Sequence, residues 1–290
     1  MGGDGVEGQK AARGGKLVKL WVNGVLLPAE ESRISPLDHG LLTGDGVFET
    51  MRIYREEAFG ARRHLARLRR SAEGLGLRPP DDSVVRSAMQ SVIEANHLVD
   101  GRIRVTLTGG VAPLSSVRGE GPPTLIVAAA TMAPWQANIG VAVAPWPRNE
   151  RGALAGIKSV SYAENVVALA WAAERGAGEA VFANTIGDLC EGTGTNVFCV
   201  LDGQLVTPPL ASGCLAGVTR ELVIELTGAR EVNVPASRLA EATEAFVTSS
   251  TREVQPVRSV DGRQLSACPG PVTRTAAAAF SDLVERDLDP

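Results

Sequence analysis

The chain has 290 residues, which is enough for about two domains at roughly 150 residues each. Hydrophobic residues make up 44% and charged residues 21% of it, a balance typical of folded globular proteins and not of disordered ones. The formal net charge is −4, which argues against a general nucleic-acid-binding surface. The longest uncharged stretch, residues 121–147, carries five prolines, so it fits strands and loops and not a membrane span.

Residues 1–16 are polar and rich in glycine, without the apolar core of a signal peptide, and we expect them to form a flexible tail. The four cysteines occur at unrelated spacings, with no C-x-x-C pair, and the three histidines are not clustered with them. We therefore expect no metal site, and a reducing cytoplasm is the default location. The cysteines are Cys190, Cys199, Cys214 and Cys268.

Hydrophobic periodicity predicts a mixture of strands and helices without strict alternation, which favours an α+β fold over a Rossmann fold. In chain order we expect a hairpin at 16–28 turning at Asn23-Gly24, a strand at 47–54, helices at 62–75 and 83–97, and strands at 102–108 and 124–130. The pattern breaks at 131–137, the predicted linker between an N-terminal domain at 17–130 and a C-terminal domain at 138–290. Beyond it we expect a strand at 140–144, a helix at 163–175, a strand at 179–183, a hairpin at 196–206, a helix at 219–227, a strand at 245–248 and a helix at 272–285.

The lysines are unusually few. Only four of the 29 basic residues are lysines, and beyond residue 19 a single one remains, Lys158, inside the apolar run 153–160. Arginine cannot replace lysine where a neutral amine is needed, because a guanidinium does not deprotonate in proteins. Burial among apolar neighbours lowers a lysine pKa from about 10.4, and a neutral amine can form the Schiff base that anchors pyridoxal phosphate. A surface lysine retained by chance is the alternative interpretation.

Two further residues fit such a cofactor. Glu191 comes just before a glycine-containing turn that leads into an apolar strand. A carboxylate beside a pyridine nitrogen keeps that nitrogen protonated and makes the ring a better electron sink, although an ordinary loop glutamate would look the same. Tyr162, four residues after Lys158, could hydrogen-bond near the lysine or simply pack in the core.

Three segments could bind a phosphate. His64 and Arg67 are three residues apart on a predicted helix, so both can point the same way. The sequence Gly217-Val-Thr219-Arg begins a helix, where free N–H groups favour an anion. The run Thr248-Ser-Ser-Thr251 supplies hydroxyl donors after a strand. Each of these features is common by itself.

Taken together, the segments resemble the class IV aminotransferases, the fold-type-IV pyridoxal phosphate enzymes. This family includes D-amino acid transaminases, branched-chain transaminases and 4-amino-4-deoxychorismate lyases. The matching stretches run in family order from about residue 20 to 275: TGDGVFET from Thr43, HLARL from His64, IKS from Ile157, CEGTGTNVF from Cys190, TPPL from Thr207, GCLAGVTR from Gly213 and TSSTREVQPV from Thr248.

The resemblance implies a role for each matching residue. Lys158 would form the Schiff base and carry the proton between the substrate Cα and the cofactor, and Glu191 would pair with the pyridine nitrogen. The remaining cofactor contacts that it implies are Arg67, Val218, Thr219 and Ser250 around the phosphate, Leu215 against the ring, Tyr162 near the ring oxygen O3′, and also Ser249.

The resemblance also implies an architecture. A small N-terminal α/β domain would precede a larger C-terminal pseudo-barrel domain that carries the lysine. The chain would form a homodimer, with the active site between the domains and completed by residues of the partner chain.

Within the family, Phe48-Glu-Thr-Met-Arg departs from the Phe-Glu-Gly-x-Arg run of the branched-chain type, and Thr248-Ser-Ser-Thr is closer to the D-amino acid type. D-amino acid transaminases hold the substrate α-carboxylate with a tyrosine, an arginine and a histidine. At the matching places this chain has Phe48, Leu114 and Ser116, so another cation is needed. Arg118 in the same loop is the candidate, because guanidinium and carboxylate form a two-point contact.

The sequence therefore predicts an aminotransferase that moves an amino group from a D-amino acid, and also from a primary (R)-amine, to an α-keto acid. The alternative is a 4-amino-4-deoxychorismate lyase that releases pyruvate and 4-aminobenzoate. A branched-chain L-amino acid transaminase is less favoured, and so is a non-catalytic family member, because Lys158, Glu191 and Arg67 are all present.

Overall fold

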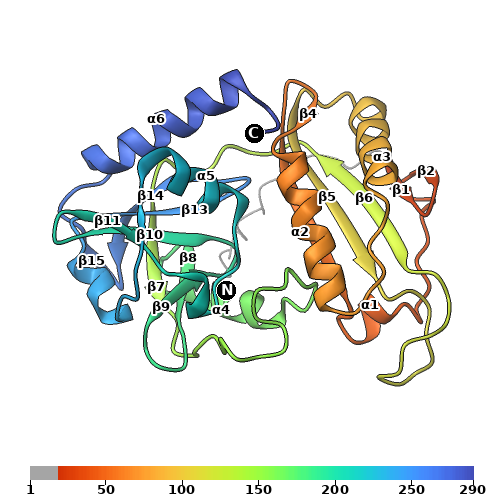
Figure 1. The fold of residues 1–290 in the computed structure, drawn as a ribbon, viewed down its shortest axis with the longest axis horizontal. Helices are drawn as coiled ribbons and strands as arrows, with labels where there is room; N and C mark the ends of the chain where they lie inside the picture. The colour runs from red at the N-terminus through yellow and green to blue at the C-terminus, as the bar shows by residue number, and fades with distance from the viewer. Residues whose placement is uncertain (1–18) are drawn as a thin grey trace, which may run out of the picture.

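The computed structural model describes residues 19–290, so the predicted tail at 1–16 lies outside the described residues. Each half of this part of the chain forms one sheet with helices packed against it (Figure 1). The mixture of antiparallel and parallel pairing agrees with the predicted α+β class. The predicted linker at 131–137 falls on the segment that joins the two sheets.

The N-terminal sheet is antiparallel, with the strand order β2-β1-β6-β5-β3-β4. Its strands are β1 (Lys19–Val22), β2 (Val25–Pro28), β3 (Gly46–Tyr54), β4 (Glu57–Ala58), β5 (Asp100–Thr108) and β6 (Thr124–Ala130). β1 and β2 form the predicted hairpin, in which Asn23 and Gly24 have φ angles of 45° and 98°. Such left-handed angles are what a two-residue hairpin turn requires, which explains the Asn-Gly pair.

Two helices cover one face of this sheet. Leu65, Leu68 and Ala72 share a helical stripe and are buried against Met51 and Ile103 of the sheet, and this packing forms the N-terminal core. The helices of this half are α1 (His39–Leu42), α2 (Ala61–Gly74) and α3 (Asp82–Ala95), of which α2 and α3 pack on the sheet.

The C-terminal sheet is mixed, with the order β12-β11-β10-β13-β14-β7-β8-β9 and β15 beside β14. Its strands are β7 (Ile139–Val143), β8 (Glu179–Ala183), β9 (Leu189–Gly192), β10 (Asn196–Leu201), β11 (Gln204–Thr207), β12 (Arg230–Glu231), β13 (Glu244–Ser249), β14 (Glu253–Val260) and β15 (Arg263–Gln264). The helices are α4 (Ala163–Ala173), η1 (Leu210–Ser212), α5 (Val218–Thr227), η2 (Ala236–Glu241) and α6 (Pro271–Arg286).

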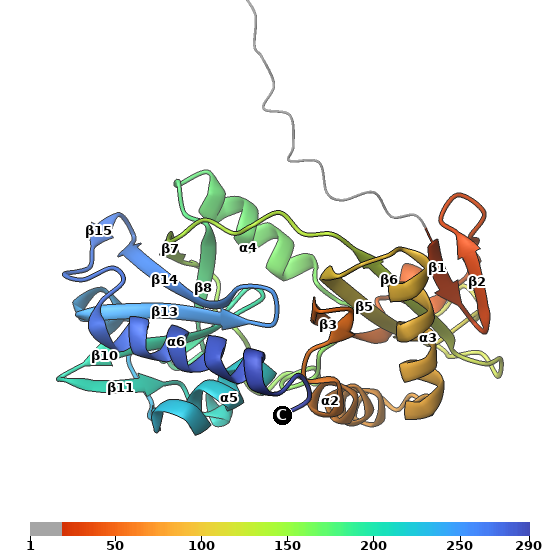
Figure 2. The ribbon, with the colours of Figure 1, turned by 90° about the horizontal axis from the view of Figure 1, so that it is seen from above.

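Helices α5 and α6 lie on one face of this sheet and α4 lies on the other (Figure 2). No helix within residues 19–290 is long and apolar enough to cross a membrane.

β14 is a central strand that the sequence patterns did not predict. It carries Pro256, and a proline inside a hydrophobic run normally argues against a central strand because it has no N–H to donate. Here the pairing with β7 begins only at Val257, opposite Ile139, so Pro256 lies just outside that ladder.

Backbone hydrogen bonds from the segment that follows β7 hold the two halves together. Phe48 donates its N–H to the Lys158 carbonyl at 3.0 Å, and Val160 donates to the Gly46 carbonyl at 2.8 Å. One edge of β3 pairs with β5. The segment around Ser159 pairs with the opposite edge, at the start of β3. Lys158 belongs by sequence to the C-terminal half, but the N-terminal sheet fixes its backbone.

Residues after α6 make a second link. The N-terminus of α2 begins at Gly60, which has no side chain to cap it. Gly60 donates instead to the Leu288 carbonyl at 2.7 Å, and the Arg62 N–H donates to the Asp289 carboxylate at 2.6 Å. The C-terminal half therefore supplies the cap of a helix in the N-terminal half.

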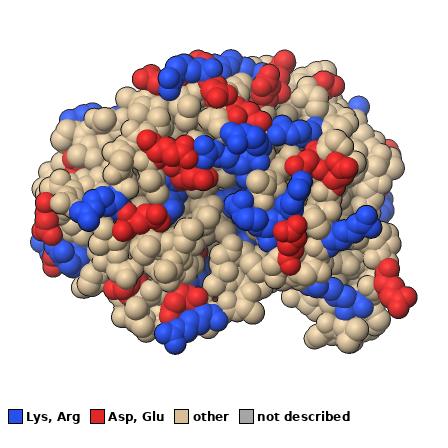
Figure 3. Space-filling model, in the orientation of Figure 1, with Lys and Arg blue, Asp and Glu red and all other residues tan. Residues whose placement is uncertain are grey.

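Figure 3 shows acidic and basic side chains interspersed over the face of the molecule that Figure 1 presents.

Replacing Asp289 tests that cap. Asp289→Ala should lower the free energy of unfolding by about 0.5–1 kcal/mol, because a carboxylate near a helix N-terminus satisfies a free N–H and the helix dipole. Chemical denaturation measures the change. Asp282→Ala, at an exposed position of α6, is the matched control and should shift stability by less than about 0.5 kcal/mol. Equal stability of the two variants would contradict the cap.

Candidate functional site

A cavity of about 570 Å³ lies between the two sheets. Its walls come from β3, β5 and α2 on one side and from the loops of the C-terminal half on the other. The sequence-predicted residues that line it are Phe48, Arg67, Lys158, Tyr162, Glu191, Leu215, Val218, Thr219, Ser249 and Ser250. Residues up to 200 positions apart in the sequence are thus brought to one cavity.

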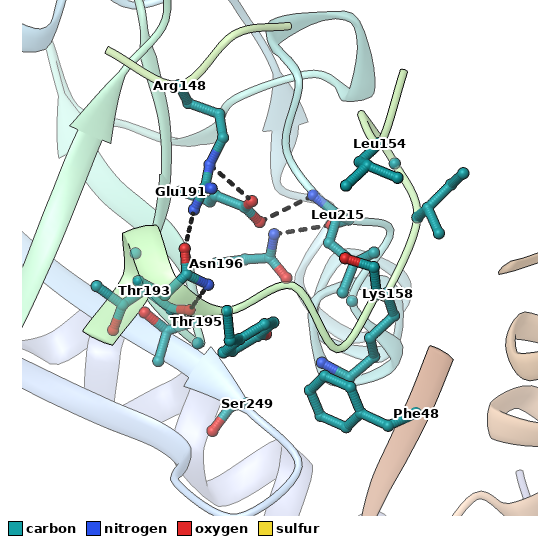
Figure 4. Close-up of a pocket in the computed structure, with 18 of the residues that line it drawn as sticks. Phe48, Arg148, Leu154, Lys158, Glu191, Thr193, Thr195, Asn196, Leu215 and Ser249 are labelled. Carbon is teal, nitrogen blue, oxygen red and sulfur yellow. Dashed lines mark hydrogen bonds and ion pairs between the residues drawn. The ribbon is translucent and has the colours of Figure 1, made fainter. Parts of the chain in front are cut away.

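Lys158 points into this cavity towards the ring of Phe48, whose centroid lies 4.4 Å from Nζ (Figure 4). The backbone N–H of Lys158 donates to the Ser71 hydroxyl on α2 at 3.2 Å. Burial, reinforced by the charge of Arg67, lowers the pKa of Lys158 to about 8. A substantial fraction of this amine is therefore neutral near physiological pH, as the sequence analysis expected.

Phe48 and Tyr162 pack edge to face, with ring centroids 5.1 Å apart. The Tyr162 ring centroid lies 5.9 Å from Lys158 Nζ, so the two rings form one wall beside the amine. Burial, followed by the charge of Glu191, raises the pKa of the Tyr162 hydroxyl. The hydroxyl therefore keeps its proton and can donate a hydrogen bond into the cavity.

Glu191 is held at the far end of the cavity. Its Oε2 accepts the Leu215 N–H at 2.8 Å, and its Oε1 lies 3.7 Å from Arg148 Nε (Figure 4). Burial raises the pKa of Glu191, while Arg148 and the Leu215 N–H oppose that rise. Arg148, which the sequence analysis did not identify, is therefore the cation that favours the ionised carboxylate.

A buried ionic cluster lies behind Arg67. Glu49, on the core face of β3, accepts from Arg67 Nε at 2.8 Å and from its NH2 group at 2.7 Å. The third guanidinium nitrogen of Arg67 donates to the Ala216 carbonyl at 2.8 Å, and His64 Nδ1 lies 2.7 Å from Glu49. Glu49 thus fixes the direction in which Arg67 points. An acidic residue on the apolar face of a strand was the signal in the sequence that could have identified it.

The start of α5 fits an anion. Gly217 precedes the helix without a side-chain cap, so the N–H groups of Val218 and Thr219 have no partner within the helix. A Cβ at Gly217 would collide with the Asn196 side chain, which explains the glycine. The buried Thr248 hydroxyl, which also lines the cavity, has no hydrogen-bond partner within residues 19–290. Free donors of this kind suit a phosphate.

Arg104 on β5 is a cation in the cavity that the sequence analysis missed. Its guanidinium lies 3.7 Å from the centroid of the Phe48 ring, and its Nε donates to the Thr106 hydroxyl at 3.1 Å. No carboxylate within residues 19–290 forms an ion pair with it. Its strand alternates, so Arg104 lies on the face opposite the buried Ile103 and Val105, which was the available signal.

Three predicted substrate contacts lie elsewhere in the chain. Leu114, Ser116 and Arg118 do not line the cavity. Arg118 binds both oxygens of Asp45 at 2.7 Å and also donates to two backbone carbonyls. In its own chain it is therefore already occupied, and Arg104 is the available cation. A contact of this loop with substrate stays a prediction that requires a second copy of the chain.

Removing the charge of Glu49 tests the buried cluster. Glu49→Gln leaves Arg67 as a buried cation without a counter-ion and should cost roughly 3–5 kcal/mol in the free energy of unfolding. Glu57→Gln, at an exposed position, is the control and should cost less than about 0.5 kcal/mol.

The pH dependence is a second test of Glu49. Although burial alone would raise it, the charge of Arg67 holds the pKa of Glu49 well below its usual range. The stabilisation is therefore present above the unfolded pKa of about 4.3 and is lost only as pH falls through the lower folded value. The stability difference from the parent should be constant from about pH 7 to 5 and shrink in stronger acid. A constant difference throughout would refute the pair.

Comparisons with known proteins agree with this arrangement. Residues 46–260 match the family model of amino-transferase class IV. The chain is 31% identical to the branched-chain-amino-acid aminotransferase of Escherichia coli over 288 residues, 91% of this chain and 92% of the relative. It is 30% identical to a D-alanine aminotransferase of Bacillus licheniformis over 276 residues, 92% of this chain and 97% of the relative.

The solved structures agree too. The crystal structure of the E. coli branched-chain amino acid aminotransferase superposes with a TM-score of 0.88 at 29% identity, covering 92% of this chain and 95% of that one. The predicted fold-type-IV architecture is thereby confirmed. The chain belongs to the class IV aminotransferases, enzymes that use pyridoxal 5′-phosphate.

Proposed function

We propose that this aminotransferase takes its amino group from a D-amino acid and passes it to an α-keto acid. The observation that carries the proposal is Arg104, a cation in the cavity with no carboxylate partner within residues 19–290. A guanidinium without a carboxylate partner can form a charge-assisted contact with an anionic ligand, and every α-amino acid and α-keto acid brings one carboxylate. The cation thus suits both the donor and the acceptor.

The residues present fit the cofactor: a lysine of lowered pKa, a buried carboxylate and free donors for a phosphate. When bound, pyridoxal 5′-phosphate supplies an aldehyde that takes up the amino group and a ring that withdraws electrons from the substrate Cα. Lys158 would hold the cofactor through its Nζ, and the same amine would be the base that moves the proton from the substrate Cα. Its lowered pKa lets it serve in both roles near neutral pH.

Two other groups support these steps. The Glu191 carboxylate would accept a ring N–H, and the nearby cation of Arg148 opposes the rise in the Glu191 pKa that burial causes. At the other end of the cavity, Arg67 and the start of α5 would hold the phosphate. Leu215, which lines the cavity, would pack against the ring.

Arg104 is well placed to hold the substrate carboxylate. Arg104 lies 3.7 Å and Lys158 Nζ 4.4 Å from the centroid of the same Phe48 ring. A ligand carboxylate bound to Arg104 would therefore lie close to the reacting amine. That placement suits a carboxylate attached directly to the reacting carbon.

Two observations favour the D configuration: Phe48-Glu-Thr in place of Phe-Glu-Gly, and the similarity to a D-alanine aminotransferase over nearly the whole chain. A branched-chain L-amino acid is the second candidate, because relatives of that type are 31–33% identical to this chain, against 30% for the D-alanine aminotransferase. The lyase alternative would use the same lysine and cofactor.

We also propose that two copies of the chain assemble, because the loop with Leu114 and Ser116 is exposed and lies outside its own cavity. The four cysteines are unpaired, which suits a reducing cytoplasm.

Lys158 gives the first test. Lys158→Ala should fold normally but lose covalent attachment of the cofactor, measured by borohydride reduction and mass spectrometry, and all turnover. In the parent, the rate of cofactor attachment to the apoenzyme should rise with pH and level off above about 8, because only the neutral amine attacks. Stopped-flow absorbance measures this rate. Activity of the alanine variant would remove Lys158 from the mechanism.

Arg104 gives the second test. Arg104→Met should slow the half-reaction with D-alanine about 10- to 100-fold, as expected for losing a charge-assisted contact of roughly 1.5–3 kcal/mol. The half-reaction with (R)-1-phenylethylamine, which has no carboxylate, should change less than about threefold. Arg102→Met is the matched control, because Arg102 lies on the same face of β5 but outside the cavity. An equal loss for both donors would exclude a carboxylate contact.

The same assay separates the candidate donors. Faster conversion of L-leucine than of D-alanine by the parent enzyme would favour the branched-chain candidate. Release of pyruvate from aminodeoxychorismate without a keto acid would favour the lyase.

A further inference from the structure

His64 lies directly behind the proposed phosphate site and does not line the cavity. Its Nδ1 is 2.7 Å from the Glu49 carboxylate, and its Nε2 is 3.2 Å from the Ser250 hydroxyl. Ser250 does line the cavity, so it lies between the imidazole and any phosphate. The chain Glu49–His64–Ser250 thus runs from the N-terminal core to the cavity.

The direction of these hydrogen bonds depends on the protonation of His64. Glu49 is ionised and can only accept, so Nδ1 must carry a proton. A neutral His64 then has a bare Nε2, which accepts the proton of the Ser250 hydroxyl. A charged His64 donates from Nε2 to the Ser250 oxygen, and only then is the hydroxyl proton free to point into the cavity.

Charge balance decides between the two states. Without a ligand, Glu49 and Arg67 cancel, and a second buried cation would be uncompensated. Burial accordingly lowers the pKa of His64, against the opposing charge of Glu49. A phosphate dianion at Arg67 and α5 reverses this balance, because it places two negative charges near the imidazole.

We propose that His64 takes up a proton from solvent when the phosphate of the cofactor binds, and that the Ser250 hydroxyl then turns from His64 to the phosphate. The step moves one proton to Nε2, and no bond between heavier atoms changes. His64 is a positioning residue that acts through Ser250. The inference rests on the proposed placement of the phosphate next to Ser250.

Three charged groups act on His64. Those that face it are Glu49 from β3, Arg67 from its own helix and Lys158 from the segment after β7.

Histidine NMR tests the proposal directly, because the chain has only three histidines. The full-length protein would be labelled with 13C and 15N in histidine, and the His64 signal assigned by its loss in His64→Gln. In the apoenzyme near pH 7.5 we expect a neutral ring protonated on Nδ1. In the holoenzyme we expect both nitrogens protonated. The same protonation state in both forms would overturn the proposal.

Two variants check the route through Ser250. Ser250→Ala should reduce the pKa difference of His64 between apoenzyme and holoenzyme. Thr251→Ala is the matched control, since this hydroxyl lines the same cavity without a bond to His64, and it should leave the difference unchanged. An unchanged difference in Ser250→Ala would remove Ser250 from the route.

Cofactor affinity gives an independent readout. Proton uptake on binding predicts that log Kd rises by up to about one per pH unit between the His64 pKa values of the apoenzyme and the holoenzyme. His64→Gln should flatten this dependence, and an unchanged slope would contradict the proposal.

Phosphorus NMR separates this inference from the proposed phosphate placement. A cofactor signal that Ser250→Ala shifts, with His64 neutral throughout, would disprove only the role of His64. A cofactor signal that neither Ser250→Ala nor Arg67→Gln affects would disprove the phosphate placement as well.

Discussion

The buried pair of Glu49 and Arg67 is the interaction on which the site depends. Glu49 has no exposed surface, so its charge is tolerable only if its oxygens are fully engaged. Arg67 satisfies both oxygens and still has one nitrogen for the Ala216 carbonyl, which lies just before α5. One carboxylate thereby sets the relative positions of β3, α2 and the turn leading into α5. The cation that faces the cavity is a consequence of packing in the N-terminal core.

The backbone of Lys158 follows the same logic. Its carbonyl pairs with β3 and its N–H with Ser71 on α2, so the N-terminal half holds the reactive residue of the C-terminal half. Arg63 reinforces the junction through Glu221 and Glu225 on α5. The two halves therefore form one structural unit at the cavity, and a change in the N-terminal core is felt at the lysine.

Local patterns were sufficient for most of the fold. The hairpin at Asn23-Gly24, the helices α2, α3, α5 and α6 and the principal strands follow from periodicity and turn residues. β14 did not, because the usual rule against proline assumes a partner on both sides, and Pro256 lies beyond the end of the β7 ladder. Such an exception depends on where a distant strand ends, which no local window contains.

Residues inside short motifs, such as Lys158, Glu191 and Arg67, were predicted to share one site, and the structure brings them to one cavity, whereas their roles there stay predictions. Arg104 and Arg148 escaped because each acts on a partner that only the fold brings near, a ring from β3 and a carboxylate from β9. Arg118 is a different case. Within its own chain the carboxylate that it binds belongs to Asp45, so its contact with substrate stays a prediction that depends on a second copy of the chain.

The choice between arginine and lysine follows the chemistry of the cavity. Groups proposed to hold an anion must stay charged, and the guanidinium groups of Arg67 and Arg104 meet this requirement, because a guanidinium does not lose its proton in proteins. The group that attacks an aldehyde must lose its proton, and only lysine can. The arginines also help it to do so, because their charges lower the pKa of Lys158 further. Replacing either arginine by lysine would therefore weaken an anion contact and also place a second titratable amine in a cavity whose chemistry requires one.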